Sequence, residues 1–327
     1  MDTCSRRDLL LGACAATLGA TNGALAQEAW PSRPIRLIVP FPPGGGSDTL
    51  SRHLTNKLSA QKGWTFVIDN KPGAGGNVGL DLVAKAKPDG YTLGMGQTAN
   101  LAINPTLYRN LPFDAARDFT PVALVASQPL VFVVRSDSSL RSVSDLLAAA
   151  QARPGVVTMA SAGNGTAGHL SGEFLARSAK VRFSHVPYKG FGQAMTDLLG
   201  GQVDFLATSP QSCIVQLRAG KVRALAVTSL KRMKLLPEVP TLAESGQAGF
   251  DAAEWKMVVG PAGLPAEVVR TLHEQVQKAL TAPDIIETLA SEGAVTMPGS
   301  VEAAREFMLA EQRRWGAVVK QSGATVE

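Results

Sequence analysis

The chain has 327 residues, of which 45% are hydrophobic and 18% charged, and its formal net charge is +5. Intrinsic disorder requires low hydrophobicity and high net charge, so this composition excludes a largely disordered chain, and the length suits about two globular domains. The basic residues form no long run and only 6% of residues are aromatic, which argues against nucleic-acid binding.

An export signal is predicted over residues 1–26. Arg6-Arg7 directly precedes an apolar stretch that ends at the small residues Ala24-Leu25-Ala26, so we expect cleavage after Ala26. The arginine pair resembles the twin-arginine pattern, with an ordinary secretory signal as the alternative. The small-residue run before Cys14 leaves a lipid anchor as a further alternative.

Cleavage at this point would leave Cys213 as the single cysteine of the mature chain, so no internal disulfide is expected. We predict that Cys213 lies on a helix as a buried structural residue rather than as a nucleophile. Beyond the signal, no apolar run reaches the 18 or so residues that a membrane span needs.

From residue 35 onward, apolar runs alternate with helical patterns and the joints are rich in glycine, which predicts an α/β fold. The predicted strands are 35–39, 65–69, 92–96, 130–135, 157–160, 203–207 and 224–228. Asp48 is predicted to cap a first helix, and Ser142 and Asp145 to form the capping box of another. Further helices are predicted at 79–86, 265–280 and 301–320, with Pro265 at the start of its helix.

Three glycine-rich loops lie where a strand ends and a helix begins, at 41–48, 72–77 and 161–166. Each can offer unpaired backbone N–H groups at a helix N-terminus, where the helix dipole also favours a carboxylate or phosphate. For any one loop alone, the tight turns that glycine permits are the favoured explanation. Three of them in one chain favour an anion-binding cleft.

A nucleotide site is poorly supported by these loops. Gly46-Ser47-Asp48 lacks the lysine of a P-loop. Gly163, Gly165 and Gly168 match the dinucleotide pattern G-x-G-x-x-G, but residues 185–189 lack the acid expected to bind the ribose. An exported α/β enzyme acting on a small anionic substrate or a dinucleotide remains the alternative function.

No local motif supplies catalytic or metal chemistry. Ser161 lacks the first glycine of a nucleophile elbow, and Gln277 stands where a zinc-protease pattern starting at His273 needs its second histidine. The four histidines share no ligand spacing on one helix. We therefore expect no enzyme activity, no metal and no cofactor.

The glycine loops and their surroundings resemble the Bug-type family, the extracytoplasmic solute-binding receptors of tripartite tricarboxylate transporters. The resemblance covers essentially the whole mature chain in order, at residues 34–45, 70–77, 88–93, 118–122, 185–190, 239–241 and 261–265. It implies a periplasmic receptor with the two-domain type II periplasmic-binding-protein (Venus flytrap) fold and a ligand cleft between the lobes.

The same resemblance implies a discontinuous first domain, 27–126 plus 254–327, and a second domain, 127–253, with crossings near Ser127 and Glu254. It implies a monomer that binds a small carboxylate through backbone amides and bridging waters and delivers it to membrane permease subunits. The ligand-binding residues that it implies are Phe41, Pro43, Gly44, Gly45, Ala74, Gly75 and Gly76 in the first lobe and Ser161, Gly163, Asn164, Gly165, Thr166, Tyr188 and Ser209 in the second. Lys256 and Met257 depart from the family pattern, as does the segment 179–181, and Lys256 lies close to the return crossing.

Overall fold

Two β-sheets organise the residues that the computed structural model describes, 30–324 and 326. Both sheets belong to the compact unit that begins at Arg33. The predicted export signal and its cleavage site lie outside the described residues. Within residues 30–324, no helix is both long enough and apolar enough to span a bilayer.

The first sheet has six strands in the order β11-β4-β10-β3-β1-β2. β1 is parallel to β2 and β3, whereas β10 runs antiparallel to β3 and β4, and β11 antiparallel to β4. The strands are β1 (Ile35–Val39), β2 (Phe66–Asn70), β3 (Thr92–Gln97), β4 (Phe119–Pro129), β10 (Ala253–Pro261) and β11 (Val295–Thr296).

The second sheet has five strands in the order β7-β6-β8-β5-β9. β6 is parallel to β7 and β8, and β5 is antiparallel to β8 and β9. The strands are β5 (Val131–Arg135), β6 (Thr158–Ser161), β7 (Ser184–Pro187), β8 (Phe205–Thr208) and β9 (Val222–Val227).

Helices connect the strands and cover both sheets. In the part that carries the six-stranded sheet, here called the first lobe, they are α2 (Gly46–Lys62), α3 (Asn77–Ala84), α4 (Asn104–Leu107), α9 (Ala266–Leu280), α10 (Pro283–Ser291) and α11 (Val301–Ser322), with the short turns η1 (Ala74–Gly76) and η2 (Ala99–Ile103). In the part that carries the five-stranded sheet, the second lobe, they are α5 (Val143–Ala152), α6 (Ala167–Ser178), α7 (Phe191–Leu199) and α8 (Pro210–Arg218).

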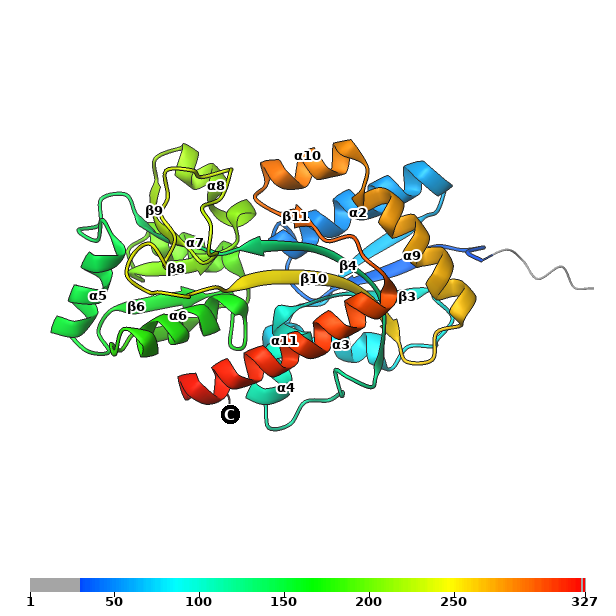
Figure 1. Cartoon of the computed structure of the whole chain (residues 1–327), viewed down its shortest axis with the longest axis horizontal. Coiled ribbons are helices and arrows are strands. Elements are labelled where there is room, and N and C mark those ends of the chain that lie inside the picture. Colours follow the sequence, from blue (N-terminus) through cyan, green and yellow to red (C-terminus); the bar gives the residue numbers. More distant parts are fainter. Residues whose placement is uncertain (1–29, 325, 327) are drawn as a thin grey trace, which may run out of the picture. The chain divides into compact units, whose positions relative to one another are not determined.

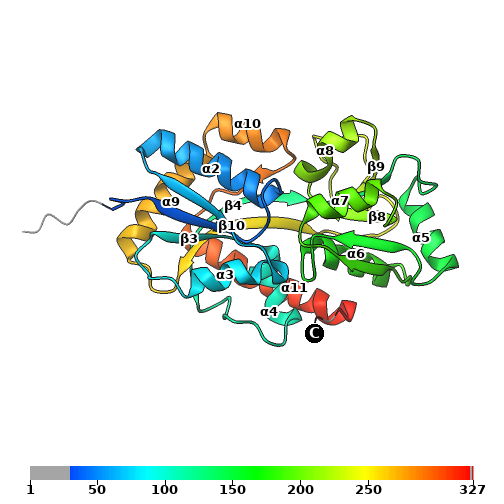
Figure 2. The same cartoon turned by 180° about the vertical axis from the view of Figure 1, so that it is seen from behind.

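Two long strands lead from one sheet to the other. β4 and β10 pair along their whole length, from Ala253 opposite Pro129 to Pro261 opposite Phe119, and run side by side in Figures 1 and 2. β4 continues through the single residue Leu130 into β5 of the second sheet. The base of the interlobe region is therefore made of two hydrogen-bonded strands.

The parallel strands decide where the helices begin. β1 is followed by α2, β6 by α6, β7 by α7 and β8 by α8, so these helices start at the carboxyl ends of parallel strands. In open α/β sheets this is the edge at which ligands bind, because the helix N-termini gather there. The topology thus places the first turns of helices from both lobes at one location.

Helix capping partly follows the sequence prediction. Ser142 caps α5, accepting a hydrogen bond from the Asp145 N–H at 3.1 Å, as predicted. Asp48 was the wrong cap for α2, because Gly45 occupies the N-cap and Asp48 lies in the first turn. From there its Oδ2 accepts a hydrogen bond from the Gly44 N–H at 3.0 Å, so it reaches back to hold the loop. Pro265 is likewise the N-cap of α9 rather than its first helical residue.

Candidate functional site

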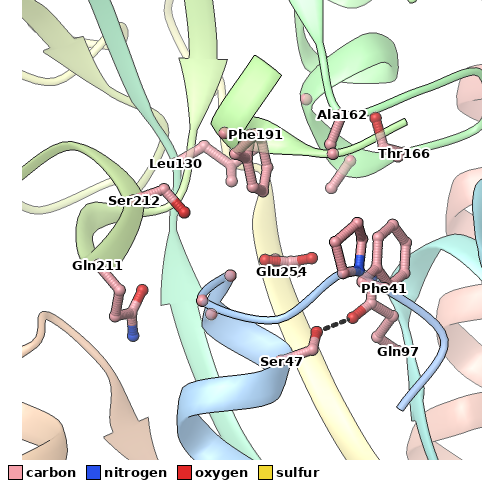
Figure 3. A pocket seen from close by; sticks show the side chains of 18 of the residues that line it. Phe41, Ser47, Gln97, Leu130, Ala162, Thr166, Phe191, Gln211, Ser212 and Glu254 are labelled. Carbon is pink, nitrogen blue, oxygen red and sulfur yellow. Dashed lines mark hydrogen bonds between the residues drawn. The ribbon is translucent and has the colours of Figure 1, made fainter. Parts of the chain in front are cut away.

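A cavity of about 290 Å³ lies between the lobes, and Figure 3 shows it from close by. Phe41 and Gln97 line it from the first lobe, Ala162 and Phe191 from the second, and Leu130 from the link between the sheets. Glu254 on β10 lies near its centre in this view and is the only charged side chain that lines it among the described residues.

Four helix N-termini meet at this cavity. Its wall includes the first turns or N-caps of α2, α6, α7 and α8, two of which begin at glycine caps, Gly45 and Gly190. A glycine cap has no side-chain oxygen to occupy the first N–H groups of its helix, so those donors stay available. Converging N–H groups and helix dipoles favour an anion without any cationic side chain.

A second cavity, of about 190 Å³, adjoins the first, and both are lined by Phe41 and Ala162. Here the loop of η1 faces residues of the second lobe. The Tyr108 hydroxyl lies 3.4 Å from the Asn164 carbonyl oxygen, to which it donates across the cleft. The two lobes therefore touch at this end of the site.

The predicted ligand-binding residues fall into three groups. Those that line the first cavity are Phe41, Pro43, Gly44, Gly45 and Thr166. Those that line the second are Phe41 again with Ala74, Gly75, Gly76, Gly163, Asn164 and Tyr188. Ser161, Gly165 and Ser209 line neither; Ser161 and Ser209 are fully buried, and all three support the loops that do.

Ser161 and two histidines hold the loop before α6. The Ser161 Oγ accepts a hydrogen bond from the Gly163 N–H at 3.2 Å and lies 2.7 Å from the His185 Nε2. The His185 ring stacks on His169, with centroids 3.9 Å apart, and the His169 Nδ1 accepts a hydrogen bond from the Gly165 N–H. The whole arrangement orients the backbone of the loop.

Both histidines are neutral near pH 7. Burial lowers the pKa of His169 to about 3, with a smaller contribution from the neighbouring His185, and burial also lowers the pKa of His185 to about 4. A neutral imidazole keeps one nitrogen as an acceptor, which the Gly165 N–H requires. The loop is therefore held without adding a charge beside the cleft.

Tyr188 at the second cavity has its hydroxyl already engaged. It donates to the Asp197 Oδ2 at 2.6 Å, and burial followed by this carboxylate raises the pKa of Tyr188 to about 12. The Thr166 hydroxyl is also hydrogen-bonded within the protein: its Oγ1 donates to the Gly163 carbonyl and, as the cap of α6, accepts from the His169 N–H. Both side chains shape the site while their hydroxyls stabilise the protein.

Residues outside the predicted ligand-binding set also line the first cavity, and Pro42, Gly46, Ser47 and Ala162 among them lie in the predicted anion loops. The full group is Pro42, Gly46, Ser47, Gln97, Leu130, Ala162, Ala167, Gly168, Gly190, Phe191, Gly192, Gln211, Ser212 and Glu254. One signal was available for Glu254: it stands two residues before Lys256 in an apolar run, a spacing that places two charges on one face of a strand. For Gln97, Gln211 and Ser212 the sequence carried no comparable signal.

The fold and the cleft define a two-lobed α/β binding protein with a cavity between its lobes at which four helix N-termini meet. Residues 50–324 match the family model TctC, the tripartite tricarboxylate transporter family receptor, and the chain belongs to this family. Members are periplasmic solute-binding receptors rather than enzymes, and they work with transporter components. The predicted family is thereby confirmed.

Sequence relatives and solved structures support the same family assignment. The chain is 42% identical over 315 residues to a UPF0065 protein in the tcbD-tcbE intergenic region of Pseudomonas sp., covering 96% of this chain and 94% of that protein. It is 35% identical to Protein BugT of Bordetella pertussis, covering 97% and 98%.

Among solved structures, an R. palustris protein with adipate superposes with a TM-score of 0.88 at 36% identity, covering 91% of this chain and all of that one. The periplasmic binding protein BugD gives 0.86 at 34% identity with the same coverage. The predicted type II periplasmic-binding-protein fold is thus confirmed.

Proposed function

We propose that this chain is a periplasmic receptor that captures a small organic carboxylate between its lobes, is not itself an enzyme, and hands the ligand to the permease of a tripartite transporter. The observation that carries this proposal is the convergence of four helix N-termini on a cavity that no cationic side chain lines among the described residues. The solved relatives from R. palustris that hold adipate and malate support the same ligand class.

Fixed backbone donors suit a receptor that must also release its ligand. Amides at helix N-termini are preorganised and neutral, so they bind an anion without the strong ion pair that would slow release. A micromolar dissociation constant, about −8 kcal/mol, would meet both needs. Closure follows if the ligand binds the closed arrangement more tightly than the open one.

The lobes move as units in this proposal. We place their boundaries as predicted, with 27–126 plus 254–327 in one domain and 127–253 in the other. The support is that β4 and β10 connect the two sheets close to Ser127 and Glu254. We further propose that the protein acts as a monomer and is exported with cleavage after Ala26, by the twin-arginine or the secretory route.

The enzyme alternative has one specific candidate, the contact between Ser161 and His185. Ser161 is fully buried, and its Oγ also contacts the Gly163 carbonyl and N–H within its own loop. A nucleophile must reach the reacting carbonyl of its substrate, which a buried and locally bonded hydroxyl does not. This geometry supports a structural role for the pair.

Thermal unfolding of residues 27–327 in the presence of organic acids tests the proposal, with the fully uncharged amide of each acid as its control. A ligand that binds only the folded state stabilises it by about 2.7 kcal/mol at 100 times its dissociation constant. We expect at least one acid, and not its uncharged amide, to raise the midpoint. A shift by nicotinamide dinucleotides and by no acid would refute the proposal and favour a cofactor site at Gly163.

A further inference from the structure

Glu254 places a carboxylate in a cleft that is otherwise built to attract anions. It is the second residue of β10, opposite Gln128 of β4. Strand alternation puts Glu254 and Lys256 on one face and Trp255 on the other, where the Trp255 indole N–H donates to Glu311 of α11 at 2.9 Å. Glu254 therefore reaches the cavity because of the register of the two connecting strands.

The Glu254 carboxylate is buried but electrically compensated. Its side chain is 8% exposed, that of Lys256 is 1% exposed, and the Lys256 Nζ lies 3.1 Å from the Glu254 Oε2. Burying a single unpaired charge is strongly unfavourable, and the pairing satisfies both groups. Lys256 thus balances the charge of the Glu254 carboxylate at the floor of the cleft.

Only one oxygen of this carboxylate is used. The Oε2 accepts from the Lys256 Nζ and from the Gln128 Nε2, the latter at 3.3 Å. No residue in the described part of the chain donates to the Oε1. An ionised carboxylate only accepts hydrogen bonds, so the Oε1 of this cavity-lining residue can pair only with a group that donates one.

The Glu254 carboxylate also determines how the side-chain amides of Gln128 and Gln211 are oriented. Because Gln128 must turn its NH₂ group toward Glu254, its Oε1 points away and accepts from the Gln211 Nε2 at 2.7 Å. This leaves the Gln211 Oε1 buried without a partner. The floor of the cavity thus carries two acceptors that lack donors, on β10 and at the start of α8.

We infer that Glu254 selects a small acid whose second polar group is a hydrogen-bond donor (a hydroxyl, primary amide or ammonium group) over a dicarboxylate. This inference rests on the proposed function: the ligand carboxylate binds at the helix N-termini, and the donor at its other end pairs with the Glu254 Oε1. A second carboxylate has no hydrogen to donate, so it would place its own acceptors against the Glu254 Oε1 and leave that oxygen without a partner.

Isothermal titration of the mature protein with matched acids tests this selection. Succinate and its monoamide succinamate have the same length and differ in one terminal group, and 4-hydroxybutanoate and 4-aminobutanoate distinguish hydroxyl from ammonium donors. We expect at least one donor-bearing acid to bind tenfold or more tightly than succinate. Glutarate and its monoamide repeat the comparison at one carbon longer.

Substitution of Glu254 tests how much its charge contributes to ligand selection. Glu254→Gln should raise the affinity for succinate at least tenfold, and the double variant E254Q/K256M should do the same while leaving no unpaired lysine. Glu311→Gln is the matched control, since this glutamate contacts the opposite face of β10, and it should leave the preference unchanged.

The outcomes separate the two proposals. If succinate binds the wild-type protein as tightly as every donor-bearing acid, or if neither Glu254 variant changes the preference, the selection by Glu254 is refuted while carboxylate binding stands. If no acid of either kind binds, the proposed function fails and the selection falls with it.

Discussion

Gly75 offers a direct test of ligand-driven closure. It lies in η1 with a φ of 63°, and a Cβ added there would lie 2.6 Å from the Asn164 carbonyl oxygen on the opposite lobe. Outside their own residue and its chain neighbours, real Cβ atoms essentially never come within 3.0 Å of a heavy atom, so Gly75→Ala requires the lobes to move apart at this point. The perturbation should therefore act on the closed arrangement more than on either lobe alone.

The expected effect has two parts. The left-handed backbone at Gly75 costs about 1–2 kcal/mol for any residue with a Cβ, and this cost applies whether the lobes are open or closed. Overpacking adds about 1–3 kcal/mol. The severe contact, with Asn164, exists only in the closed arrangement, whereas a milder one, 3.0 Å from the Asn104 Nδ2, lies within the first lobe. If binding requires closure, that second part weakens ligand affinity about 5- to 150-fold.

Gly63→Ala is the matched control. Gly63 ends α2 with a φ of 70°, and no heavy atom lies within 4 Å of an added Cβ. Gly63→Ala should lower the free energy of unfolding by the same backbone cost of about 1–2 kcal/mol. Its ligand affinity should equal that of the wild-type protein. Titration calorimetry with the tightest acid measures the affinities, and small-angle X-ray scattering measures closure. Equal affinities for G75A and G63A would refute a requirement for closure at this point of contact.

Three further predictions concern the second lobe. Because unfolded histidine titrates near pH 6.5 and folded His169 and His185 only near pH 3 and 4, the unfolded state binds more protons between these values. The free energy of unfolding should thus fall as pH drops from 6.5 toward 4. The contribution of His169 is up to about 1.4 kcal/mol per pH unit. Equal midpoints of urea unfolding at pH 7 and pH 5 would contradict this prediction. Burial raises the pKa of Cys213 to about 12, so a thiol reagent should label it only after unfolding, and rapid labelling of the native protein would argue against its burial. Gly172→Ala would drive a Cβ into Met159, so we expect a loss of about 1–3 kcal/mol in thermal or urea unfolding, and an unchanged midpoint would show that the helix has room there.

Local patterns predicted most of the regular structure. The β-branched run at β1 and the Ser142 cap of α5 lie where the sequence indicated. The sequence analysis did not predict β10, because Glu254 and Lys256 interrupt its apolar pattern with charges. Those charges are tolerated because they pair with each other, and such a compensation depends on side chains meeting in space.

The amino-acid sequence alone indicates the three glycine loops as candidate anion sites, and the structure places 41–48 and 72–77 against the loop before α6. The roles of individual residues within the loops were harder to predict. Ser161 and Gly165 face the interior and hold the loop through His185 and His169. Spacing along the chain does not distinguish a residue that lines a cavity from one directly behind it.

The sequence by itself determined where helices begin with unpaired N–H groups, because a glycine between a strand and a helix acts within a few residues. Only the tertiary structure decided that two glycine-capped helix starts, of α2 and α7, meet the starts of α6 and α8 at one cavity, since this depends on which strands are parallel and on the pairing of β4 with β10. The same pairing sets Glu254 beside Gln128, residues far apart in the chain. Donors are a local property of the backbone, whereas a binding site requires donors from distant segments to converge.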